Sequence, residues 1–225
     1  TTPTLTGSQS VAVNPAPISW LYVSDMPDPF LASSSSNITV IAKDPYWNHI
    51  TDYTGTIRFT STDKAATLPA NYTFVAADNG SHTFVNGVTL RTLGSQTVTV
   101  TDTALPSIHG QQTVNVTASA AATLQITGVS SPTTAGSSGS ITVTAKDALG
   151  NTAAGYRGTV HFTSSDTTAT PPADYTFTAG DNGSHTFVNS LILRTAGNQS
   201  VSVSDTGSPS TVSYTHLTLP TNREV

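Results

Sequence analysis

Side chains that could support nucleophilic hydrolysis occur together twice in this chain of 225 residues. Ser81-His82 follows Asp78, and Ser184-His185 follows Asp181. In a hydrolase the His must hydrogen-bond the Ser that it activates. Neighbouring residues of a β-strand point to opposite faces, so an adjacent Ser and His cannot form this bond when the chain is extended. We therefore predict a polar hairpin at both places, and we expect neither catalytic residues nor enzyme activity.

Eight aspartates could together supply hard oxygen ligands for Ca²⁺. They are Asp44, Asp63, Asp78 and Asp102, matched later in the chain by Asp147, Asp166, Asp181 and Asp205. Their spacing fits no Ca²⁺-binding loop, and Asp is also a favoured turn residue. We expect turns, with calcium between domains as the alternative, and no other cofactor. The histidines lack metal-ligand spacing and have no Cys partners, so a zinc site is not expected.

One loop carries two aromatic residues and a histidine. The segment 44–49 reads Asp-Pro-Tyr-Trp-Asn-His, whereas its counterpart 147–152 reads Asp-Ala-Leu-Gly-Asn-Thr. If Gly150 has a positive φ, Trp47 at the same position costs about 1–2 kcal/mol of backbone strain, which points to a function. Tyr46, Trp47 and His49 are then candidate contacts for a sugar ring or a protein partner. The alternative, which we favour, is that Trp47 covers the end of its domain or contacts the adjoining domain near Trp20.

These side chains are positioned by a sequence that repeats itself without a gap. The heptapeptide that starts at Asp78 returns at Asp181, 103 residues later, and from Pro69 to Phe84 13 of 16 positions are identical to their counterparts. Self-similarity at a fixed period is typical of tandem arrays. Catalytic sites are usually built once per chain, so the repeat favours a role in length, spacing or multivalency.

Each copy consists of short runs of alternating apolar and polar residues, separated by turn residues. In the second copy these runs include 124–126, 141–145, 160–162, 175–177, 184–193 and 201–203. Period-two alternation predicts strands with one buried and one solvent-facing side. About seven antiparallel strands in about 100 residues indicate an all-β fold of tandem immunoglobulin-like β-sandwiches, without substantial helix. The Asn182-Gly183 dipeptide predicts the tip of a hairpin between 175–177 and 185–187.

The same offset sets the expected domain boundaries. We assign 1–17 to the last strand of a preceding repeat, 18–120 to a first repeat, and 121–210 to a second repeat truncated before its last strand. Residues 211–225 leave the pattern, and residues 212–221 resemble one reading frame of a transposon-based sequencing adapter. We interpret 211–225 as a non-native tail. Because Leu217 and Leu219 fall 103 residues after Val114 and Val116, we predict that this tail takes the position of the missing strand.

Composition excludes several classes of partner and site. The net charge is −5 and only 9% of the residues are charged, so the chain lacks the basic stripe that a nucleic-acid backbone requires. No apolar run in the sequence is long enough to span a bilayer. Cys is absent, which excludes disulfides and thiolate metal sites. We therefore expect neither nucleic-acid binding nor a membrane span in this fragment.

Three segments carry a family resemblance, at 135–151, 156–166 and 173–183. They resemble bacterial immunoglobulin-like tandem repeats of large surface and secreted proteins, similar in style to the stalks of invasin and intimin. The resemblance implies a structural or adhesive segment, a stalk or spacer, that lies outside the cell or at its surface. Its expected partners are neighbouring repeats, and a surface glycan or a host protein. Two alternatives stay open: a carbohydrate- or protein-binding module that uses Tyr46 and Trp47, and accessory domains of a secreted polysaccharide-degrading enzyme.

Overall fold

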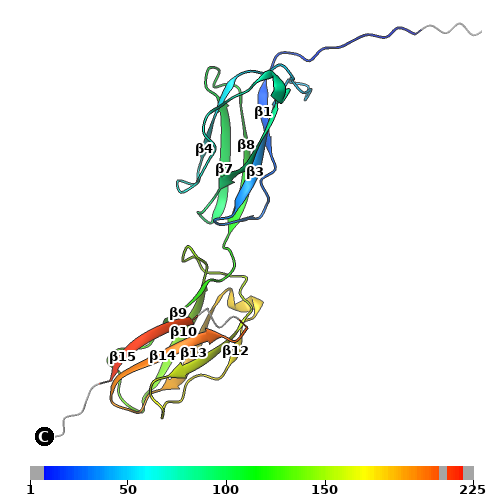
Figure 1. The fold of residues 1–225 in the computed structure, drawn as a ribbon. Coiled ribbons are helices and arrows are strands. Elements are labelled where there is room, and N and C mark those ends of the chain that lie inside the picture. Colours follow the sequence, from blue (N-terminus) through cyan, green and yellow to red (C-terminus); the bar gives the residue numbers. More distant parts are fainter. Residues whose placement is uncertain (1–7, 208–211, 220–225) are drawn as a thin grey trace, which may run out of the picture. The chain divides into compact units, whose positions relative to one another are not determined.

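The chain divides into two all-β units, Thr1–Thr117 and Ala118–Val225 (Figure 1). This computed structural model describes residues 8–207 with their side chains, and residues 212–219 by their backbone. In the described part of the chain, helical structure is limited to two three-residue 3₁₀ turns, Ala76–Asp78 and Ala179–Asp181. No helix there has the length and apolar character needed to span a lipid bilayer.

The first unit is a sandwich of two sheets. One sheet has the order β1 (Trp20–Ser24), β3 (Ser35–Lys43), β6 (Ser81–Thr89). The other has the order β2 (Phe30–Leu31), β8 (His109–Thr117), β7 (Gly94–Asp102), β4 (Thr56–Ser61), β5 (Tyr72–Thr73). This is an immunoglobulin-like arrangement, as the sequence predicted. It differs in one detail, because β2 pairs with β8 in parallel, whereas we expected only antiparallel strands.

The second unit repeats this architecture, with seven strands among its described residues. One sheet has the order β13 (Ser184–Ile192), β10 (Ser138–Lys146), β9 (Thr123–Thr127). The other has the order β12 (Tyr175–Thr176), β11 (Thr159–Ser164), β14 (Gly197–Asp205), β15 (Val212–Leu219). All of its named pairings are antiparallel. The predicted fold class is therefore confirmed in both units.

The last strand, β15, pairs with β14 in the register that β8 adopts on β7. Gly197 lies opposite Leu219 and Gln199 opposite Leu217, as Gly94 lies opposite Val116 and Gln96 opposite Val114. The backbone of residues 212–219 thus occupies the position of the closing strand, as the alternation predicted. The foreign origin of 211–225 stays a prediction, and residues 208–211 and 220–225 lie outside the described residues.

The segment assigned to a preceding repeat forms no strand over residues 8–17, and residues 1–7 lie outside the described part. A strand needs a neighbour to satisfy its backbone groups, and this segment pairs with no sheet of the first unit.

Both cores are formed by the alternating apolar residues. In the first unit Leu21, Ile57, Val98 and Val100 are fully buried, while Thr side chains occupy the outward positions. The outward Thr residues pair across strands, for example Thr97 with Thr113 at 2.8 Å between the hydroxyl oxygens. Such cross-strand pairs stabilise the outer face of a sheet.

A glycine brings the two sheets of the first unit close together. At Gly110 on β8, a methyl group in place of hydrogen would lie only 2.7 Å from the carbonyl carbon of Leu21 on β1, and closer still to its oxygen. Ordinary contacts of a side-chain Cβ begin near 3.4 Å. Only glycine fits where two backbones approach in this way.

The predicted hairpin at Asn182-Gly183 is wrong. Strand β12 pairs with β11 and β13 pairs with β10, so the two strands belong to different sheets. Asn182 and Gly183 have positive φ, at 48° and 79°, and end the 3₁₀ turn by which the chain crosses from one sheet to the other. The Asn-Gly signal for positive φ was correct, but such a pair serves the end of a helical turn as well as a hairpin tip.

Candidate functional site

Asp44 and Asp147 organise the same turn in the two units. Oδ1 of Asp44 accepts the backbone N–H groups of Tyr46 at 2.9 Å and Asn48 at 2.8 Å. Oδ2 accepts the N–H of Ala16 at 2.9 Å, in the segment that leads into β1. Asp147 accepts the corresponding N–H groups of Leu149, Asn151 and Ser119. Burial opposes ionisation, but these hydrogen bonds outweigh it and lower the pKa of both carboxyl groups.

Two further aspartates of each unit are also held by hydrogen-bond donors. Asp63 accepts the N–H groups of Arg91 and Thr92 and the Thr92 hydroxyl, and these bonds keep its pKa low despite burial. Asp102 accepts the Tyr53 hydroxyl at 2.6 Å, and Asp205 accepts the Tyr156 hydroxyl at the same distance. Burial, followed by the hydrogen bond to the carboxylate, raises the pKa of both tyrosines.

These contacts favour the turn role of the aspartates over calcium binding. The described residues contain no group of three or more His, Asp or Glu side chains arranged to hold a metal ion. The oxygens described above instead face N–H and O–H donors, which a cation would have to replace. Calcium between domains stays an untested alternative.

The two Ser-His pairs are arranged around aspartates. Nδ1 of His82 lies 2.9 Å from Oδ1 of Asp78, and the ring stacks on Tyr72 with centroids 4.0 Å apart. His185, Asp181 and Tyr175 repeat this arrangement at 2.7 and 3.9 Å. The backbone N–H of Thr178 and then His185 lower the pKa of Asp181.

The serine of the second pair faces elsewhere. The hydroxyl of Ser184 lies 2.8 Å from that of Thr144 on β10. Each His is thus packed against a Tyr and an Asp, which is the geometry of a structural cluster and not that of a nucleophile with its base.

The loop with Trp47 contains the backbone strain that the sequence predicted. Gly150 has a φ of 82°, and Trp47 at the corresponding position has a φ of 69°. A positive φ is a genuine outlier for so large a side chain. Lys43 supports the strained residue by donating from Nζ to the carbonyl oxygen of Trp47 at 3.3 Å.

Trp47 packs against two aromatic residues of β1 and forms an aromatic cluster with them. Its ring meets Trp20 edge to face with centroids 4.3 Å apart, and Tyr22 at 5.9 Å. Trp20 and Tyr22 alternate with the buried Leu21 and Val23, so both rings project from the outer face of β1. The indole N–H of Trp20 donates to the carbonyl oxygen of Asp44 at 3.2 Å, which ties the loop to the strand.

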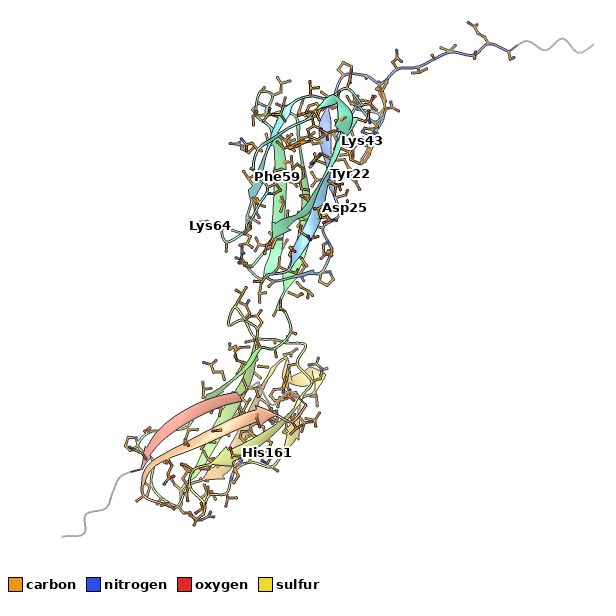
Figure 2. All side chains as sticks on the ribbon, viewed as in Figure 1. Tyr22, Asp25, Lys43, Phe59, Lys64 and His161 are labelled. Carbon is orange, nitrogen blue, oxygen red and sulfur yellow. The ribbon has the colours of Figure 1, made fainter. Side chains whose placement is uncertain are left out.

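An open groove runs along this aromatic cluster, with a volume of about 550 Å³. One wall is formed by Trp20, Tyr22 and Trp47, and the other by residues 109–111 at the start of β8. We call it the aromatic groove. The groove lies on the side of the first unit where Figure 2 labels Tyr22, on β1, and Lys43, at the end of the neighbouring β3.

The structure places the three predicted contact residues in different surroundings. Trp47 lines the aromatic groove and is 61% exposed. Tyr46 is 77% exposed and does not line it. His49 turns inward, where its buried Nε2 has no hydrogen-bond partner among the described residues, 3.3 Å from where a Cβ on Gly80 would lie.

Sequence reasoning missed Tyr22, His109 and Gln111 as groove residues. A signal for Tyr22 was present, because its counterpart in the second copy is Gln125, just as the counterpart of Trp20 is Thr123. The counterpart groove of the second unit has a volume of about 490 Å³ and is lined by Thr123, Leu124, Gln125, Lys146 and Gly150. Among the side chains that the structure describes, this lining contains no aromatic residue.

Comparison with known proteins finds likeness at the level of structure. No family model and no curated protein sequence matches the chain. The Escherichia coli adhesin FdeC aligns with a TM-score of 0.49 and 21% identity over 89% of this chain and 63% of its own. The Yersinia pseudotuberculosis adhesin InvE aligns at 0.39 and 18%, over 89% of this chain and 58% of its own. A Parabacteroides merdae β-glucuronidase aligns at 0.34 and 10%, over 90% of this chain and 25% of its own.

The chain spans less than two thirds of the length of each of these proteins. TM-scores below 0.5 at 10–21% identity identify neither a family nor a function for this chain. The immunoglobulin-like fold of the two units rests on their own sheet order.

Proposed function

We propose that the chain is a structural and adhesive segment of a large extracellular or cell-surface protein, in which each unit acts as a stalk or spacer. The observation that carries this proposal is the way in which the connecting segments are anchored. Ala16 donates to Asp44, and 103 residues later Ser119 donates to Asp147, so each unit holds the segment that enters it by the same backbone hydrogen bond. A feature copied with the repeat is expected where units are joined in series.

The exit from the first unit is also anchored. The carbonyl oxygen of Thr117, the last residue of β8, accepts the N–H of Ala32 at 2.9 Å. Only Ala118 separates this residue from Ser119, which is bonded to the next unit. So short a connection leaves little free chain between the anchored end of the first unit and the anchored start of the second.

Strand pairing in the first unit suits such a load. Because β2 and β8 are parallel, tension that reaches both strands once β1 has detached pulls them in opposite directions along their length. The hydrogen bonds between them are then loaded together in shear, not broken one after another. The described part of the second unit has no counterpart of β2.

Single-molecule force spectroscopy on the whole chain tests the spacer role. We expect two discrete unfolding events, each releasing about 340–370 Å of extended chain for a repeat of 103 residues. The unit with the parallel pair is expected to unfold at the higher force, and Gly110→Ala, which weakens only that unit, identifies its event. Extension without discrete events would refute a load-bearing role.

The extracellular location needs a separate test. Antibodies against this chain should label intact, unpermeabilised cells of the source organism or be captured from its medium. Labelling only after permeabilisation would contradict the location. The alternative of an accessory domain in a polysaccharide-degrading enzyme would be supported by a catalytic domain encoded in the same gene.

A further inference from the structure

We propose that the aromatic groove of the first unit binds a neutral oligosaccharide chain. This activity goes beyond the stalk role and does not depend on it, because a spacer needs no ligand. The inference rests on the difference between the two copies, on the energetics of Trp47, and on the chemistry of the groove.

The second copy shows that the fold does not need the aromatic cluster. Trp20, Tyr22 and Trp47 correspond to Thr123, Gln125 and Gly150, although the strands around them match in length and register. The three aromatic residues come from two separate stretches of sequence and meet only in the folded unit. A coordinated difference of this kind is expected for a binding site and not for core packing.

Trp47 is only partly buried in its position. The positive φ of 69° carries a backbone cost. The edge-to-face contact with Trp20 offsets part of that cost. The side chain nevertheless stays 61% exposed, so much of its apolar surface gains nothing from the fold. An exposed ring held on a strained and pinned loop is available to a ligand.

The lining of the groove indicates the class of that ligand. Its aromatic wall offers ring surfaces on which the C–H groups of a sugar ring can stack, and the opposite wall and rim offer polar side chains such as Ser107, His109 and Gln111. Among the described residues, no Asp, Glu, Lys or Arg lines the groove. This uncharged combination is complementary to a hydroxyl-rich neutral ligand and offers nothing specific to an anionic one.

The size and shape agree with an oligosaccharide. The volume of about 550 Å³ lies within the range of about 300–1,000 Å³ that small-molecule sites occupy. The groove is open to solvent, so a chain too long for it can extend beyond it.

The chain contains a built-in reporter for this site. It has two Trp residues in all, and both belong to the aromatic cluster. Intrinsic Trp fluorescence therefore reports on the groove alone. We would titrate the whole chain with a panel of neutral hexasaccharides, cellohexaose, xylohexaose, maltohexaose and chitohexaose, and expect a saturable change with at least one of them.

Variants separate a ligand contact from a packing role. Trp47→Gly restores the residue of the second copy, and we expect it to weaken binding at least tenfold by calorimetry while raising the unfolding midpoint. Tyr46→Ala, next to it but outside the groove, is the matched control and should bind like the native chain. Binding that survives in Trp47→Gly would overturn the proposal, as would a lower unfolding midpoint together with unchanged binding.

The titration with the four hexasaccharides is a second test of the proposal. If no hexasaccharide gives a saturable change at millimolar concentration, the groove is not a sugar site. If unfolded casein changes the fluorescence and no hexasaccharide does, the groove binds peptide and the proposal is wrong. Neither result would affect the spacer role, which force spectroscopy tests separately.

Discussion

The close approach at Gly110 leads to a sharp prediction about the stability of the first unit. Gly110→Ala places a methyl group 2.7 Å from the carbonyl carbon of Leu21, where about 3.4 Å is the lower limit of ordinary contact. The atoms that the methyl group would meet on β1, the carbonyl carbon and oxygen of Leu21, belong to the backbone. No side chain can therefore rotate away to make room. Strand β1 must therefore move away from β8 by on the order of 1 Å.

This displacement reaches two core side chains. Leu21 and Val23 are 0% and 6% exposed, and each contributes roughly 1.5–3 kcal/mol by burial. A gap of about 1 Å removes a quarter to a half of the dispersion attraction of the atoms that line it. We therefore expect the variant to lose about 1–3 kcal/mol of unfolding free energy, a substantial part of the roughly 5–15 kcal/mol typical of a domain.

Urea unfolding followed by Trp fluorescence measures this loss in the first unit alone, because both Trp residues lie there. With a urea slope of about 2 kcal/mol/M, the midpoint should fall by about 0.5–1.5 M. Asn115→Ala, an exposed position on the same strand, is the matched control and should change the stability by less than about 0.5 kcal/mol. A Gly110→Ala midpoint equal to that of the control would refute the reasoning.

Three further predictions concern the hydrogen bonds and strain of both units. Tyr53→Phe and Tyr156→Phe each remove one hydroxyl bond to a carboxylate, so each should destabilise its own unit by about 1.5–3 kcal/mol in urea unfolding, and equal effects are expected because the two bonds are alike. Gly150→Ala should cost about 1–2 kcal/mol although its methyl group would meet no atom within 4 Å, because the cost comes from φ alone; an unchanged midpoint would contradict this. The carboxyl groups of Asp63 and Asp102 have pKa values lowered by folding, so the stability they provide is present above the unfolded value of about 3.9 and is lost as the pH falls through the folded values. The urea midpoint should therefore decrease when the pH is lowered below about 4. The midpoint of Asp63→Asn should depend less on pH than that of the native chain.

The strands and the fold class could be predicted because alternation and repetition agree. Each copy places its apolar residues at period two, and an alignment at the 103-residue offset tests every assignment twice. The same comparison predicted the positive φ of Trp47 from Gly150. Local sequence is sufficient for these features because they depend on backbone geometry and on one buried face.

The sheet to which a strand belongs could not be predicted in the same way. An Asn-Gly pair signals positive φ but does not reveal whether the chain returns to the same sheet or crosses to the other. Here Asp78 and Asp181 accept the backbone N–H groups of Val75 and Thr178 and stabilise a 3₁₀ turn that crosses between sheets. That choice depends on hydrogen bonds that only the folded turn brings together.

The residues that form the aromatic groove could not be predicted from the sequence, for a similar reason. Trp20 and Tyr22 lie more than twenty residues before Trp47, and His109 lies more than sixty residues after it. Their proximity follows from the pairing of β1 with β3 and from the approach of β8 at Gly110. His49 is close to Trp47 in sequence, yet its side chain turns toward Gly80 and away from the groove.

The shared register of β7 and β14 has a consequence for how such a chain is synthesised. The inward residues of β7, Gln96, Val98 and Val100, are identical to those of β14, so the inward face of this strand does not distinguish one copy from the other. If two copies were unfolded at the same time, strands of one copy could pair with a sheet of the other. Such mispairing is a failure typical of repeat proteins. Folding of the first copy as it emerges removes its strands from that competition. The order of synthesis, and not the core, is therefore what we expect to keep neighbouring copies separate.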